Sequence, residues 1–183
     1  MRTGQSIALD HYLVSAARLG DEQALGRLVD RWQPKLLRHA SRLLGEVEPA
    51  REATQEAWLE ILRGLPRLRE ARAFPAWAYR IISRRCAAGI RQRQSQRQRT
   101  GTENFEAVPS NTESPEQSAS ADELHALLAG LPAHHRATLA LFYLEGLTVA
   151  EIAAALEIAP GTVKTRLMHA RNRMRILLQG ETP

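Results

Sequence analysis

The chain has 183 residues, with 25 Lys and Arg against 20 Asp and Glu, a formal net charge of +5. This length fits one medium domain or two small ones, and the positive balance favours a polyanionic partner such as nucleic acid. The single cysteine, Cys86, excludes an internal disulfide and a cysteine metal cluster, and we expect it to be a small buried side chain. Without a signal-peptide core or a membrane-length apolar run, we expect a cytoplasmic protein that does not insert into membranes.

Helical spacing dominates the first part of the chain, because aromatic residues make up only 5% and no alternating strand pattern persists. The first predicted helix covers residues 8–19. Asp21 is expected to cap a second helix over residues 22–44, which ends at Gly45. Pro34 lies inside the second helix and is expected to break or kink it, because proline lacks a backbone donor and clashes with the preceding turn.

A third helix is predicted over residues 49–63, and its surface is mostly acidic. Glu52, Gln55, Glu56 and Glu60 share this face, with the large apolar Trp58 and Leu59 beside them. A surface that faces DNA would not carry these charges, whereas a protein partner with a basic groove would suit them. The alternative is an ordinary exposed side of a helix.

Arginines crowd the fourth predicted helix, residues 74–98, and glutamines rather than acids separate them. Like charges on one helix cost stability, so a partner that neutralises them, such as a nucleic-acid backbone, is indicated. Trp77 lies just upstream, where an aromatic ring beside arginines can stack an unpaired base. The alternatives are a core role for Trp77 and a solvated helix end for the arginines. The arginines of this helix are Arg80, Arg84, Arg85, Arg91, Arg93 and Arg97, and Arg99 follows its predicted end.

The composition changes after this helix. Residues 100–120 hold four glutamates, two prolines and no Lys or Arg, which predicts a flexible acidic linker. The linker divides a domain at residues 1–99 from a domain at residues 121–183. In the second domain, helices are predicted over residues 122–129 and 133–145.

The last part of the chain has the pattern of a helix-turn-helix. Thr148 and Glu151 form a capping box at the start of one helix, and Pro160 suits the first position of the next. Two short helices with a basic second member are typical of a DNA reader whose second helix lies in the major groove. The alternative is a buried helical hairpin with a solvated cationic face. The exposed side of the second helix carries Lys164, Thr165, Arg166, His169 and Arg171, followed by Arg173.

No pattern in the chain points to catalysis. There is no nucleophile–base pair, metal-ligand spacing or phosphate-binding loop in the sequence. His134 and His135 are adjacent on a helix, where side chains diverge by about 100 degrees, so they make a poor metal site. We therefore expect an all-α protein of two small helical domains that is not an enzyme and has no metal, cofactor or small-molecule substrate.

Three segments, in this order, carry a resemblance to a known family. They read REATQEAWLEIL, FPAWAYRIISRRCAAGIRQR and LPAHHRATLALFYLEGLTVAEIAAALEIAPGTVKTRLMHARNRMR. With a polar linker between the second and the third, the chain resembles a bacterial RNA polymerase sigma factor of the extracytoplasmic-function (ECF) group. The resemblance implies a region 2-like domain, a region 4-like helix-turn-helix domain, and promoter-specific initiation with core RNA polymerase under the control of an anti-sigma factor.

The resemblance also implies a role for each matched residue. The residues implied to dock on a coiled coil of the polymerase's largest subunit are Glu52, Gln55 and Glu56, with Trp58 packed behind. Recognition and melting of the minus-10 element fall to Trp77, Arg80, Arg84, Arg85 and Arg91. Recognition of the minus-35 element falls to Lys164, Thr165, Arg166, His169, Arg171 and Arg173. Residues 68–75 would capture a flipped base, and the linker would run toward the polymerase active-site channel.

The chain departs from the family pattern at several of these places. Arg84 and Ala88 stand where asparagine and aspartate are usual, which bears on the minus-10 preference but leaves the DNA contact in place. His169 stands where arginine is frequent, and a neutral imidazole would weaken a phosphate or guanine contact. Ala159 replaces a serine cap, a loss of about 1 kcal/mol that Pro160 offsets in part.

The predicted mechanism is that of a dissociable initiation subunit. Alone, its two domains are expected to be loosely tethered and to bind promoters poorly, and polymerase would fix their separation so that two weak contacts act together. One alternative is an activator that dimerises through its N-terminal helices and reads palindromic sites. Another is a helical adaptor that binds only proteins.

Overall fold

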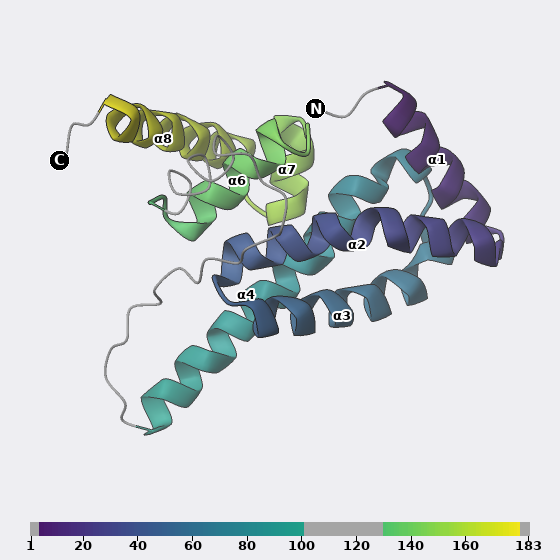
Figure 1. The fold of residues 1–183 in the computed structure, drawn as a ribbon, viewed down its shortest axis with the longest axis horizontal. Helices are drawn as coiled ribbons and strands as arrows, with labels where there is room; N and C mark the ends of the chain where they lie inside the picture. The colour runs from purple at the N-terminus through teal and green to yellow at the C-terminus, as the bar shows by residue number, and fades with distance from the viewer. Residues whose placement is uncertain (1–3, 101–129, 180–183) are drawn as a thin grey trace.

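The computed structural model describes residues 4–100 and 130–179, with side chains for 4–95 and 130–176. All regular elements in these ranges are helices, which confirms the all-α expectation for them (Figure 1). The predicted helix at 122–129 and nearly all of the predicted linker lie outside them. No helix of the described ranges has the length and apolar character needed to cross a membrane.

The N-terminal half begins with α1 (Gly4–Arg18) and α2 (Glu22–Leu44), which pack against each other. The predicted ends of α2 are confirmed. The Asp21 carboxylate accepts from the Ala24 backbone N–H at 2.9 Å, and Gly45 ends the helix in the left-handed conformation at φ 73°. Both signals are local, and glycine tolerates that conformation without steric cost.

The prediction that Pro34 breaks this helix is wrong. Helix α2 runs without interruption through Pro34, whose side chain is exposed. Trp32 and Leu36, on either side of it, are almost fully buried. Burial of such side chains stabilises by about 1.5–3 kcal/mol each, enough to offset the roughly 3 kcal/mol cost of an internal proline.

Because packing rather than local preference holds α2 together here, Pro34→Ala should stabilise the protein by about 1–3 kcal/mol. Alanine restores the missing backbone hydrogen bond and removes the steric clash. The measurement is the midpoint of thermal or urea unfolding, which should rise. Gln33→Ala, at the neighbouring exposed position, should leave the midpoint nearly unchanged. A Pro34→Ala midpoint at or below that of the wild type would contradict this account.

Helix α3 (Val47–Gly64) and helix α4 (Phe74–Thr100) complete the N-terminal bundle, joined by the short turns η1 (Leu65–Arg67) and η2 (Ala71–Ala73). Figure 1 shows α3 alongside α2, α4 crossing both, and the C-terminal part of α4 projecting beyond the bundle.

Aromatic rings fill the centre of this bundle. The Trp32 ring meets the Phe74 ring edge-on at 5.0 Å between centroids and lies 5.8 Å from the Tyr79 ring. Cys86 is fully buried, as expected, and burial raises the pKa of its thiol to about 12. The thiol is therefore neutral and unreactive at physiological pH.

The C-terminal half contains α6 (Ala133–Tyr143), α7 (Val149–Leu156) and α8 (Pro160–Gln179). The predicted capping box is confirmed: the Thr148 hydroxyl accepts from the Glu151 backbone N–H, and the Glu151 carboxylate accepts from the Thr148 N–H. Glu157 makes the turn into α8 with a left-handed φ of 54°. Helices α7 and α8 therefore form the predicted helix-turn-helix.

The two halves are packed together in this structure. Helix α7 lies along α4 and helix α6 lies on α2, while α8 lies on the far side of α6 and α7 (Figure 1). One hydrophobic core includes buried side chains of both halves, such as Ile82 of α4 and Ile152 of α7. The expectation of loosely tethered domains is wrong for this conformation, because apolar faces of α6 and α7 cover apolar faces of the bundle.

Candidate nucleic-acid interface

One face of α8 forms a cationic surface that is open to solvent. Val163, Leu167 and Ala170 are buried on the opposite face of the helix. The exposed face thus follows from helical periodicity, since residues three and four apart share a side. The predicted minus-35 residues Lys164, Thr165, His169, Arg171 and Arg173 are exposed, and Arg166 is half-buried.

Arg171 is held in place by aromatic side chains of α6. Its Nε donates to the Tyr143 hydroxyl oxygen at 2.9 Å. Its guanidinium lies 5.8 Å from the Phe142 ring and 5.6 Å from the Tyr143 ring. Cation–π contact and the hydrogen bond limit the freedom of this side chain, so less entropy is lost when it binds an anion.

Three histidines gather beside the same face of α8. The His134 and His135 rings lie 4.3 Å apart, and the His135 ring stacks on the His169 ring at 6.1 Å between centroids. The prediction that the side chains of His134 and His135 diverge is wrong, because rotation about their side-chain bonds brings the rings together. Within the described ranges, no three His, Cys, Asp or Glu side chains are grouped so that they could hold a metal ion.

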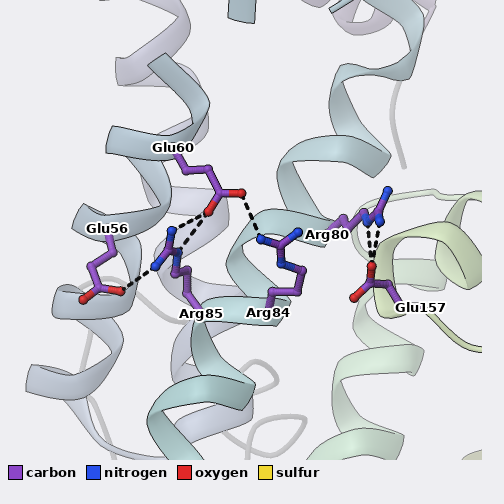
Figure 2. A network of polar contacts seen from close by, with 6 residues as sticks. All are labelled: Glu56, Glu60, Arg80, Arg84, Arg85 and Glu157. Carbon is purple, nitrogen blue, oxygen red and sulfur yellow. Dashed lines mark hydrogen bonds and ion pairs between the residues drawn. The ribbon is translucent and has the colours of Figure 1, made fainter. Parts of the chain in front are cut away.

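Three of the four predicted minus-10 arginines of α4, namely Arg80, Arg84 and Arg85, pair with carboxylates (Figure 2). Arg80 donates to Glu157 of the helix-turn-helix, with its Nε and Nη2 at 2.8 and 2.7 Å from Oε1. Arg84 contacts the Glu60 carboxylate of α3 at 3.2 Å. The sequence interpretation placed Glu60 on the acidic face but missed it as the partner of Arg84 and Arg85. This pairing depends on how α3 and α4 cross, which helical spacing does not give.

Arg85 joins the predicted DNA surface to the predicted polymerase surface. Its Nε and Nη2 lie 3.1 and 2.5 Å from Glu60 Oε2, and its Nη1 lies 3.4 Å from Glu56 Oε2. Figure 2 shows Arg85 between the two glutamates of α3. Sequence reasoning placed Glu56 and Arg85 on separate surfaces, whereas the crossing of α3 and α4 brings them together.

Trp77 is half-buried at the start of α4 and packs on α3. A Cβ atom at Gly64 would lie 2.7 Å from its Cζ2 atom, so the ring is seated where only glycine leaves room. Part of Trp77 thus belongs to the core, in line with the alternative considered for it. Arg91, farther along α4, is exposed.

On α3, the predicted polymerase residues Glu52, Gln55 and Glu56 are exposed. Trp58 is 8% exposed, so it lies beneath this face and supports it from inside the bundle. Leu59 is 50% exposed, and it adds an apolar element beside the acidic face. An exposed large apolar side chain next to such charges is typical of a protein-binding surface.

Polar side chains cross the boundary between the two halves. Arg136 of α6 donates two hydrogen bonds, at 3.0 and 2.8 Å, to the Arg42 carbonyl oxygen near the end of α2. Burial lowers the pKa of the Arg42 guanidinium, and the nearby Glu145 carboxylate opposes that shift. Burial also raises the pKa of the Tyr79 hydroxyl well above its usual value, and Glu145 raises it further. Glu145 is itself buried, so it acts as the counter-charge at this boundary.

A groove of about 500 Å³ runs between α4 and α7. Arg84, Arg85 and Arg91 line one side, and Leu156 and Glu157 line the other. The groove therefore offers cationic and apolar groups side by side, where the two halves meet.

Comparisons with known proteins identify both halves. Residues 28–96 match sigma-70 region 2, and residues 121–174 match sigma-70 region 4. The chain is 32% identical to the RNA polymerase sigma-H factor of Pseudomonas aeruginosa over 93% of its own length and 94% of that protein. It is 33% identical to the ECF RNA polymerase sigma-E factor of Escherichia coli (strain K12), covering 88% of this chain and 90% of that one.

A solved structure shares the fold. It is a complex of the sigma factor RpoE with the anti-sigma factor NepR from Bartonella quintana, with a TM-score of 0.73 and 22% identity over 86% of this chain and 98% of that one. The two family models and the two relatives confirm the family resemblance found in the sequence. The chain belongs to the sigma-70 family as an ECF RNA polymerase sigma factor, a non-catalytic subunit that directs transcription initiation.

Proposed function

We propose that residues 1–99 dock on core RNA polymerase and melt the minus-10 element, and that residues 121–183 read the minus-35 element. The acidic face of α3 would bind the polymerase, α4 would hold the melted strand, and α8 would enter the major groove. Residues 100–120 would connect the two domains, and the protein would act in the cytoplasm. The observation that carries this proposal is the pair of surfaces, an acidic one on α3 and a solvent-exposed cationic one on α8.

The packing of the two halves makes promoter binding dependent on polymerase. The minus-10 and minus-35 elements lie roughly 25 base pairs apart, which is about 85 Å of duplex. In this structure Arg80 of α4 contacts Glu157. Pro160, the first residue of α8, comes three residues after Glu157 and so lies within about 11 Å of it. One duplex cannot meet both surfaces in this conformation, so the halves must separate before both elements are read.

Polymerase docking would also change the pairing of one arginine on the proposed DNA surface. Glu56 belongs to the proposed docking face and also holds Arg85. When a basic surface of the polymerase takes the Glu56 carboxylate, Arg85 keeps only Glu60, so its charge is less fully neutralised and attracts DNA phosphates more strongly. Docking and DNA binding would then favour each other through one shared carboxylate.

An anti-sigma factor would favour the packed halves over the separated halves, the opposite of what promoter binding requires. We place its contact in the groove between α4 and α7, because a segment bound there touches both halves at once. An acidic amphipathic segment would complement Arg91 and Leu156. By binding only the packed conformation, it would shift the population toward it.

Run-off transcription with purified core polymerase on genomic fragments tests this function. Start sites that appear only when the protein is added, each preceded by a non-palindromic two-part promoter, are the expected result. If no new start sites appear, the proposed promoter reading is wrong. A palindromic site bound by a dimer without polymerase would favour the alternative of a dimeric activator.

His169→Arg should tighten binding to a minus-35 duplex by up to about tenfold at pH 7.5, because arginine adds a permanent charge and a fork that fits phosphate or guanine. Fluorescence anisotropy with the promoter mapped by run-off measures this. His169→Gln, which adds no charge, should give no gain. If the affinity of His169→Arg equals that of the wild type, the side chain at position 169 does not face DNA.

A further inference from the structure

A group of four potential cations lies at one flank of the proposed minus-35 surface. We call it the histidine cluster: His134 and His135 from the first turn of α6, and Arg166 and His169 from α8. The His135 ring contacts His134 at 4.3 Å and His169 at 6.1 Å between centroids. Arg166 is close enough to lower the pKa of both α6 histidines. Two helices thus bring together groups that the sequence separates by more than 30 residues.

In the part of the chain that the structure describes, no carboxylate is in ion-pair contact with the cluster. Among the ion pairs of the described residues, none joins a carboxylate to these three rings. Helix α2, packed on α6, presents Arg42, whose carbonyl oxygen binds Arg136. Helix α7 presents Glu151, which caps its own helix through Thr148. Among the ion pairs of the described residues, the cluster is therefore positive or neutral.

This arrangement disfavours protonated imidazole. Burial, followed by the Arg166 charge, lowers the pKa of His134. Burial, followed by His134, His169 and Arg166, lowers the pKa of His135. At neutral pH these two rings are thus mostly uncharged. An anion placed among them would offset the repulsion and favour the protonated form, so its binding would take up protons.

We propose that the histidine cluster is a contact for DNA backbone phosphates beside the minus-35 element, with an affinity that rises as the pH falls. This inference rests on the proposed role of α8. In helix-turn-helix complexes the backbone runs along the flanks of the recognition helix, and phosphate contacts there fix its register. His134 and His169 are exposed on such a flank, and His135 joins them. The cluster adds α6 to a DNA surface that the sequence interpretation confined to α8.

The direction of the pH effect follows from proton uptake. If the bound state holds more protons than the free state, affinity increases as the pH falls. Uptake of about one proton over part of this range predicts roughly tenfold tighter binding at pH 5.5 than at pH 7.5.

The test uses the full-length protein and a fluorescein-labelled 20-base-pair duplex of mixed sequence, because phosphate contacts do not depend on sequence. Anisotropy titrations at pH 5.5 and 7.5, at constant ionic strength, compare the wild type with His134→Gln/His135→Gln/His169→Gln. The wild type should bind about tenfold more tightly at pH 5.5, and the triple variant should change by no more than about twofold. His11→Gln, on α1, is the matched control and should keep the wild-type response.

A triple variant that keeps the full pH response, or a wild type that shows none, would overturn the inference. Titration of the imidazole protons of the wild type by NMR avoids any effect of the substitutions on folding: the pKa of the cluster histidines should rise when the duplex is added, and no rise argues against the contact. Lys164→Ala at pH 7.5 tests the role of α8 separately. If that variant binds as well as the wild type, the proposed role of α8 fails, while the pH response still decides whether the cluster binds DNA.

Discussion

Replacing Glu52, Gln55 and Glu56 together with alanine should reduce the affinity for core RNA polymerase by at least about 100-fold and abolish promoter-directed run-off. The three side chains are exposed on one face of α3, so a polymerase surface that pairs with them would lose all of its partners. Truncation of a charge that is buried at an interface costs about 2–5 kcal/mol, because its partner is left unpaired. Titration calorimetry or co-purification with core polymerase measures the loss.

The fold should survive this change. Arg85 keeps Glu60, at 2.5 Å, when Glu56 is removed. Exposed ion pairs contribute about 0–1 kcal/mol each, so the unfolding midpoint should move little. A matched control replaces Glu22, Gln23 and Asp30, which are exposed on α2, and removes the same charge from another surface. If the α3 variant binds polymerase like this control, the acidic face is not the docking site.

Glu145→Ala should separate the two halves of the protein. Glu145 is buried at their boundary and is the counter-charge of Arg42. Removing this carboxylate takes away the charge that opposes the burial of the Arg42 guanidinium, so the packed arrangement is destabilised. When the two halves separate, water can solvate the Arg42 guanidinium. Loss of Glu145 therefore favours the separated arrangement over the packed one. Energy transfer between dyes on α3 and α8, or small-angle scattering, should report a longer distance.

The double variant Glu145→Ala/Arg42→Met is the control, because it removes both charges and should restore much of the packing. The open single variant should also bind duplex DNA without polymerase more tightly than the wild type, since the surface of α4 is then uncovered. An unchanged dye-to-dye distance in Glu145→Ala would show that this pair does not hold the halves together.

Helix ends and helix faces could be predicted from the sequence because their causes are local. The bond from Ala24 to Asp21 and the capping box of Thr148 and Glu151 each join residues only three positions apart. The solvent-exposed face of α8 follows from the spacing of its apolar residues, which any 3.6-residue helix turns to one side. These local signals were sufficient to predict the helix-turn-helix and the order of the helices along the chain.

The partners of the candidate site could not be predicted in this way. Arg85 and Glu60 are 25 positions apart, and Arg80 and Glu157 are 77 apart. Their contact depends on how α4 crosses α3 and α7, and periodicity sets the face of a helix but not its crossing angle. The uninterrupted helix at Pro34 has the same origin, because burial on both sides outweighs a local preference.

The amino-acid order alone was therefore enough to predict an all-helical chain and its family, and to propose residues that bind polymerase and DNA, because backbone capping, apolar periodicity and charge are properties of short segments. Only the folded chain revealed three features: the packed arrangement of the halves, the carboxylates that pair with arginines of α4, and the contact among three histidines. Each of these depends on apolar faces of segments far apart in the sequence packing against one another. That packing also determines which charged side chains come into contact.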